Sequence, residues 1–164
     1  MKKLLIIMFI FVPLILSAEG WKSKNIDDYS FSWRFVEDNL EVELSYPVEG
    51  WIAIGFDAEK KMGGANIIIG SVSGDEVIIE DHFGNGTYRH ASDEKLGGTS
   101  DVESVEGDEK DGITTLKFTI PADSGDEYDK PLVEGQTYRV IFASSSSDNI
   151  GRKHRNRTGA DITL

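Results

Sequence analysis

Met62 lies in the stretch KKMGGANIIIGS, residues 60–71, where its thioether has no obvious packing role. Methionine usually fills gaps in apolar cores, and a position followed by Gly63 and Gly64 is poorly suited to burying one. The other two methionines, Met1 and Met8, lie in the N-terminal segment. Beyond that segment, Met62 is therefore the one residue that can offer a thioether sulfur to a bound metal.

The chain contains three histidines, and they differ in their surroundings. His82 falls in an expected strand and His90 in a polar loop, where either is readily explained as an ordinary, partly exposed side chain. His154 stands in GRKHRNRTG, whose positive residues are Arg152, Lys153, Arg155 and Arg157. A solvated basic loop that balances an acidic patch would explain this stretch. Contact with nucleic acid would explain it too, but the overall charge disfavours that reading.

Short stretches of alternating apolar and polar residues predict an antiparallel β-structure. The expected strands are residues 29–35, 40–46, 50–56, 66–72, 76–83, 112–121 and 136–145, with weaker ones near 99–107 and 160–164. Turn residues separate them at short intervals, and no window of 11 or more residues after the N-terminal segment has a helical apolar stripe. Eight or nine short strands in one domain predict an all-β, antiparallel β-sandwich.

The first residues have the pattern of a secretory signal peptide. Lys2 and Lys3 precede an unbroken apolar run at residues 4–16, and small or polar residues follow at Ser17 and Ala18. The apolar run of 13 residues is shorter than the roughly 20 that cross a bilayer. We therefore expect a removed signal peptide at 1–18, a single domain at 19–164 without a membrane span, and a secreted or periplasmic location. A retained N-terminal anchor is the alternative.

Charge and cysteine content exclude several classes of function. Without Lys2 and Lys3, 15 basic side chains oppose 29 acidic ones, a charge that repels nucleic acid and anionic membranes and attracts cationic proteins. Cysteine is absent, which excludes disulfides, thiolate metal sites and covalent c-type haem attachment. The domain must be held together by packing, alone or with a tightly bound ligand.

Several segments follow one another in a characteristic order: GWIAIGFD, a methionine, GGANIIIGSV, EDHFGNG, TLKFTIPADSGD, YRVIFASSSS, and a late histidine followed by arginine and glycine. From about Trp33 to Leu164 this order resembles a DOMON domain of the haem-binding type, similar to the cytochrome domain of cellobiose dehydrogenase. Such domains are immunoglobulin-like antiparallel β-sandwiches that hold one b-type haem between a methionine and a histidine. The resemblance implies haem b as cofactor, with Met62 and His154 as the axial iron ligands.

This resemblance has physical consequences for the expected function. Methionine and histidine together leave no open position on the iron, so an exported b-type cytochrome that transfers electrons is expected rather than a catalyst on its own. Arg155 and Arg157 are candidates for pairing with the haem propionates. Trp51 and Ile67 are candidates for apolar contact with the porphyrin, although a one-residue register error would turn them to the other face of the sheet. The acidic surface predicts a redox partner protein with a basic docking surface.

Two other functions are compatible with the sequence. A haem-free carbohydrate-binding or interaction module would use exposed aromatic side chains, such as Trp21, Trp33, Tyr88 and Tyr128. A calcium-dependent module would use the carboxylates of residues 101–111 and 123–129, although neither segment matches an EF-hand loop and exposed acidic turns explain both more simply. No spacing of serines and carboxylates singles out a hydrolytic nucleophile and its base.

Overall fold

The structure, a computed structural model, describes residues 20–164, and the predicted signal peptide at 1–18 lies outside this part. The described chain forms eleven strands and one short helical turn, α1, at Asp93–Leu96. The strands are β1 Lys22–Ile26, β2 Tyr29–Val36, β3 Asn39–Tyr46, β4 Ile52–Phe56, β5 Asn66–Ser73, β6 Glu76–Gly86, β7 Arg89–Ser92, β8 Glu103–Lys110, β9 Ile113–Pro121, β10 Thr137–Ser144 and β11 Asn156–Thr163. Between residues 20 and 164, no helix is long and apolar enough to cross a membrane.

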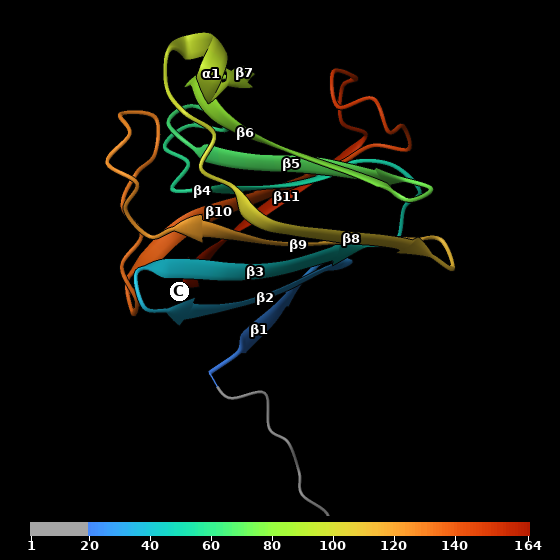
Figure 1. Ribbon diagram of the computed structural model, residues 1–164, viewed down its shortest axis with the longest axis horizontal. Coiled ribbons are helices and arrows are strands. Elements are labelled where there is room, and N and C mark those ends of the chain that lie inside the picture. Colours follow the sequence, from blue (N-terminus) through green and yellow to red (C-terminus); the bar gives the residue numbers. More distant parts are fainter. Residues whose placement is uncertain (1–19) are drawn as a thin grey trace, which may run out of the picture.

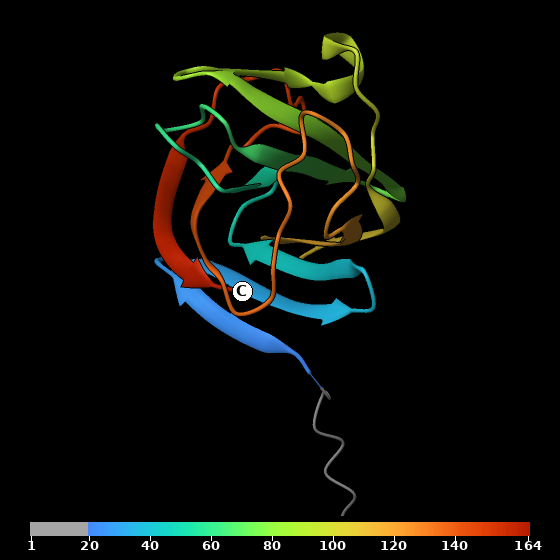
Figure 2. The same cartoon turned by 90° about the vertical axis from the view of Figure 1, so that its left-hand side faces the viewer.

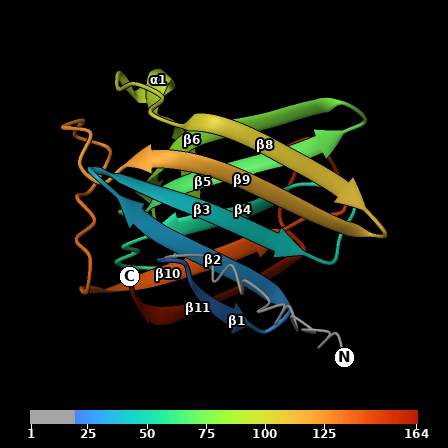
Figure 3. The ribbon, with the colours of Figure 1, turned by 60° about the horizontal axis from the view of Figure 1, so that its bottom comes forward.

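The strands form two antiparallel sheets that pack face to face (Figure 1). One sheet has five strands in the order β1-β2-β3-β9-β8, which lie side by side in Figure 3. The other has six strands in the order β11-β10-β4-β5-β6-β7. The predicted all-β, antiparallel sandwich is confirmed.

The hairpin of β2 and β3 shows how alternation builds the core. Phe31 pairs with Leu44 and Trp33 with Val42, so their apolar side chains share the inner face of the five-stranded sheet. The ring of Phe31 stacks on Trp33 at 4.6 Å and meets Phe142 of the opposite sheet edge-on at 5.9 Å. Apolar burial between the two sheets therefore holds them together without disulfides.

The six-stranded sheet is apolar on its outer face as well. Every residue of β4 and all but the last of β5 are buried. Ile54 and Phe56 belong to the core between the sheets, whereas Trp51, Ile67 and Ile69 belong to a second apolar cluster on the other face. The structure thus resolves the register that the sequence leaves open, and it places a large apolar surface outside the sandwich core.

The number of strands is larger than the predicted eight or nine. β1 is mostly exposed and lacks an apolar alternation, so pairing with β2 stabilises it rather than burial of its own side chains. β7 and α1 fall in a stretch expected to be a loop, and the pairing of β7 with β6 is irregular between Phe83 and Gly86. β11 begins at Asn156 instead of near residue 160, because its polar first half pairs with β10 along the sheet edge.

Candidate functional site

A cavity of about 1180 Å³ lies on the outer face of the six-stranded sheet, and we call it the sheet-face cavity. Its volume is somewhat above the roughly 300–1,000 Å³ of ordinary small-molecule and cofactor pockets. The apolar part of its wall includes Trp51, Ala53, Met62, Ile67, Ile69, Ile141, Ala143 and Ile150. These residues all belong to the second apolar cluster, so the apolar outer face of the sheet lines this cavity.

Met62 reaches the cavity from the loop between β4 and β5. Its backbone N–H points to the carbonyl of Thr87 at 3.4 Å, and its carbonyl accepts a hydrogen bond from Ala65 at 3.1 Å. Gly84 of β6 runs directly beneath this loop, since a Cβ added there would overlap the Met62 carbonyl oxygen and lie 2.6 Å from its carbonyl carbon. A glycine in β6 therefore allows the loop to hold the thioether against the sheet.

His154 reaches the same cavity from the segment between β10 and β11. Burial, followed by the positive charges of Arg157 and Lys153, lowers the pKa of His154 below its usual value. The imidazole is therefore neutral at pH 7, the form in which histidine coordinates a metal. β4 and β10 are antiparallel, so the loops that carry Met62 and His154 leave opposite ends of the sheet.

The other two histidines also line the cavity, which the sequence did not indicate. The Nδ1 atoms of His82 and His90 are 2.8 Å apart, and His82 Nε2 lies 2.9 Å from Glu80 Oε2. Burial, then the charges of His82 and His154, lowers the pKa of His90. The sequence does indicate that Glu80 and His82 share one face of β6, because they are two residues apart in one strand.

Basic side chains surround the cavity although the chain as a whole is acidic. The lining includes Lys61, Arg89, Lys95, Arg139, Arg152, Lys153 and Arg157, against Glu80 as its one acidic residue. Two of these basic side chains, from different elements, lie near Tyr88. The Lys61 amine lies over the Tyr88 ring at 4.1 Å, and the positive charge of Arg157 contributes to lowering the pKa of Tyr88. This basic rim favours a ligand with an apolar body and anionic groups.

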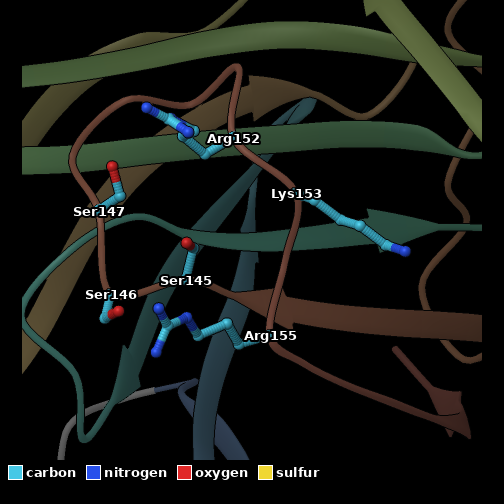
Figure 4. A pocket seen from close by; sticks show the side chains of 6 residues that line it. All are labelled: Ser145, Ser146, Ser147, Arg152, Lys153 and Arg155. Carbon is cyan, nitrogen blue, oxygen red and sulfur yellow. The ribbon is translucent and has the colours of Figure 1, made fainter.

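Of the six predicted site residues, the structure brings five to one cavity, and these are Trp51, Met62, Ile67, His154 and Arg157. The sixth, Arg155, lines a separate pocket of about 370 Å³ together with Ser145, Ser146 and Ser147. Figure 4 shows its guanidinium beside Ser146. Residues two apart share a face only within one strand. β11 begins at Asn156, so Arg155 precedes the strand and is not held on the face that Arg157 occupies.

Three features of the cavity fit a haem. The donors include a thioether and neutral imidazoles, which are ligands that iron accepts. Gly55 leaves the apolar floor of the cavity without a further side chain, since a Cβ there would lie 2.8 Å from Ile141 and 3.1 Å from Ile67. Within residues 20–164, the buried indole Nε1–H of Trp51 has no hydrogen-bond partner, so the wall holds a donor free for an anionic group of a ligand.

The four aromatic side chains proposed for sugar binding do not form one exposed surface. Trp33 is only 4% exposed and packs in the core, so it is not available to a sugar ring. The Trp21 ring lies 5.0 Å from the guanidinium carbon of Arg34, and Tyr128 packs against Phe83. Tyr88 alone among the four candidates is largely exposed, at 70%. The described residues thus contain no row of exposed aromatic rings built from the predicted set.

A group of carboxylates, which we call the acidic cluster, lies at one end of the sandwich. It consists of Asp81, Asp93, Asp101, Asp126 and Asp129. Because Glu80 and His82 face the sheet-face cavity, Asp81 between them points to the opposite face of β6. Burial, together with the charges of the neighbouring carboxylates, raises the pKa of Asp81 to about 7 despite a hydrogen bond from the Asp101 N–H, which lowers it.

We expect Asp81 to make the metal-free domain less stable as pH rises. The folded state holds a proton on Asp81 up to about pH 7, whereas the unfolded chain releases it near pH 3.8, so stability is lost between these values. In a chelator, the free energy of unfolding of Asp81→Asn minus that of the wild type, measured by denaturant unfolding, should grow from pH 4 to 7 by an amount on the order of a few kcal/mol.

The same difference for Asp108→Asn, a change on an exposed strand position, should stay constant with pH. Taking differences between variants cancels the opposite contribution of His90 and His154, whose lowered pKa values destabilise the fold toward acid pH. Equal pH profiles for the two variants would contradict this prediction.

Residues 25–145 match the DOMON domain family. Over 41 residues the chain is 44% identical to the DOMON domain-containing protein FRRS1L of Mus musculus and of Homo sapiens. That segment is 25% of this chain and only 14% of the length of those relatives.

Two solved structures share the fold. The cytochrome b domain of pyranose dehydrogenase from Coprinopsis cinerea superposes with a TM-score of 0.58 at 15% identity, covering 83% of this chain and 77% of that one. The cytochrome domain of cellobiose dehydrogenase from Myriococcum thermophilum gives a TM-score of 0.61 at 12% identity, covering 87% and 81%. With the family match over most of its length, this chain belongs to the DOMON domain family, as its sequence predicted.

Proposed function

We propose that this chain is an exported b-type cytochrome domain that binds one non-covalent haem b and transfers electrons. One observation carries the proposal: Met62 and His154, from loops at opposite ends of the sheet, line a single large cavity. Its apolar floor and basic rim match the two parts of a haem, a flat apolar ring and two carboxylates. The fold shared with cytochrome domains of two dehydrogenases supports the same conclusion.

Each part of the cavity has a defined task in this proposal. The sulfur of Met62 and the neutral imidazole of His154 would hold the iron. Ile67 and Ile69 would shield the porphyrin from water, and Arg157 would pair with a propionate at the rim. The free Nε1–H of Trp51 supplies a further hydrogen-bond donor.

The bound haem would supply a one-electron change of iron oxidation state. Two protein ligands leave no coordination position for oxygen or substrate, which limits the site to electron transfer. The Met62 thioether would raise the reduction potential above that of a site with two imidazoles, since sulfur stabilises ferrous iron. The apolar floor would act in the same direction, because it disfavours the extra positive charge of ferric iron.

Location and partner complete the proposal. The signal-peptide pattern of residues 1–18 supports export, and a non-covalent cofactor suits a chain without cysteine. Outside the basic rim the surface is acidic, including the mostly exposed side chains of β8. An acidic surface steers a protein with a basic docking patch toward this domain, so we expect its electron exchange to slow as ionic strength rises.

An absorbance spectrum tests the proposal most directly. The purified chain, expressed with ample haem or reconstituted with haemin, should bind one haem per chain and give a low-spin, six-coordinate spectrum in both oxidation states. The cofactor should be extractable into acidic organic solvent, because no cysteine anchors it. A colourless protein that does not take up haemin would overturn the proposal and favour the haem-free interaction module.

A further inference from the structure

We propose that the acidic cluster is a calcium site, separate from the sheet-face cavity, that fastens two loops to β6. One oxygen each of Asp81, Asp101 and Asp129 lies within 4.8 Å of the others. Calcium binds oxygens at about 2.3–2.6 Å, so two ligands on opposite sides of one ion lie up to about 5 Å apart. The three carboxylates are therefore spaced to share a single ion.

Unpartnered buried atoms point to a ligand at this place. Asp81 is 2% exposed, and its Oδ2 accepts a hydrogen bond from the Asp101 N–H at 3.1 Å while its Oδ1 accepts none within the described chain. Asn66, which is 5% exposed, donates from Nδ2 to Asp129 Oδ1 at 2.6 Å, and its own Oδ1 also lacks a partner. Both oxygens therefore remain available to a cation at the cluster.

Asp93 strengthens this argument. It is fully buried, and neither of its carboxylate oxygens has a hydrogen-bond partner among residues 20–164. Its charge acts on Asp81 and Asp129, which places it next to the three spaced carboxylates. A buried carboxylate without hydrogen bonds is costly unless a cation or metal compensates it.

No basic side chain compensates this charge. In the described part of the chain, none of the five aspartates of the acidic cluster forms an ion pair with lysine, arginine or histidine. The nearby Lys130 pairs instead with Asp57 and Glu59. Where these carboxylates are ionised, only a cation from solution can balance their charge.

The ligands come from three separate elements at the end of the sandwich that faces the reader in Figure 2. Asp81 is fixed in β6, Asp101 lies in the segment between α1 and β8, and Asp129 lies in the long loop between β9 and β10. Thr99 also bridges the two loops, because its N–H donates to Asp126 Oδ2 at 2.7 Å. One ion would join all three elements.

The ligand chemistry selects calcium among the common divalent cations. Carboxylate and amide oxygens are hard ligands that suit calcium and magnesium rather than zinc or copper. Calcium accepts six to eight oxygens in irregular geometry, whereas magnesium requires a near-ideal octahedron and keeps several of its waters. A set of carboxylates drawn from two loops and a strand suits the less demanding ion.

Thermal unfolding and titration calorimetry of the chelator-treated chain test the proposal. Adding CaCl₂ at constant ionic strength should raise the unfolding midpoint by at least about 3 °C and give one binding event per chain. MgCl₂ at the same concentration should raise it less. The variant Asp101→Asn should be more stable than the wild type without calcium, since one repelling charge is removed, yet should lose most of the calcium-dependent shift.

Asp108→Asn is the matched control, because it removes the same charge from β8 outside the cluster. It should keep the full response to calcium. If the wild type shows no shift and no binding heat, the proposal is wrong. It is equally wrong if Asp101→Asn and Asp108→Asn respond alike, since calcium would then act on the general negative charge of the surface. Haem content is not used as a readout, so failure here leaves the proposed cytochrome function untouched.

Discussion

Replacing His154 with alanine is expected to remove most of the haem from the protein. The neutral imidazole is the stronger of the two proposed ligands, and Met62 alone holds iron weakly. We expect at least a roughly 100-fold loss of haem affinity, which equals about 2.8 kcal/mol. Haemin titration followed by absorbance measures it. The fold should survive, because His154 lies outside both sheets in a segment between β10 and β11.

Met62→Ala is the paired variant, and its expected result differs in kind. Haem should stay bound through His154, but the ferric spectrum should become high-spin or water-ligated and the reduction potential should fall. His90→Ala serves as the control, since His90 lines the same cavity and lies close enough to His154 for their charges to interact. If His90→Ala loses the haem and His154→Ala keeps it, the axial histidine has been assigned to the wrong residue.

The fold was predictable because its strands obey a simple rule. β2, β3 and β9 are buried on one face only, so apolar and polar residues alternate and reveal the strands. β1 and β7 lack this alternation, because they are edge strands held mainly by backbone pairing. Sequence patterns report burial, so they miss strands that bury little.

The same rule explains which parts of the candidate site could be foreseen. The run NIIIGSV in β5 is buried on both faces, a pattern that points to a second covered surface beside the core. It does not say which residues face that surface, and Ile67 and Ile69 were separated from Ile54 and Phe56 only by the register of the sheet. Only the tertiary structure shows that His82 and His90 share a cavity with Met62 and His154.

Charge is distributed very unevenly over this acidic chain. Seven of its basic side chains surround the sheet-face cavity, whereas five aspartates without ion pairs in the described chain gather on the other face of β6. β6 separates the two environments, since Glu80 and His82 face the cavity and Asp81 faces the cluster. Because side chains alternate along a strand, β6 can present Glu80 and His82 to the cavity and Asp81 to the acidic cluster.

Gly84→Ala is expected to disrupt the site more than any other change of a single methyl group. An added Cβ would overlap the backbone carbonyl of Met62, which cannot turn aside as a flexible side chain would. The loop is tied to β6 at this point, because Gly64 donates a hydrogen bond to the Gly84 carbonyl and Gly84 donates one to Ala65, both at 2.8 Å. Relief of the overlap must therefore break these bonds.

We expect Gly84→Ala to cost about 3 kcal/mol of folding free energy, a drop of roughly 10 °C in the unfolding midpoint, and to displace the Met62 sulfur from the iron. Gly86→Ala, in the same strand, is the control, because its added Cβ would meet the flexible side chain of Arg89 instead of backbone. Thermal unfolding and the ferric spectrum measure the two effects. Retention of a six-coordinate, low-spin spectrum in Gly84→Ala would show that the position of Met62 in this loop does not determine the ligation.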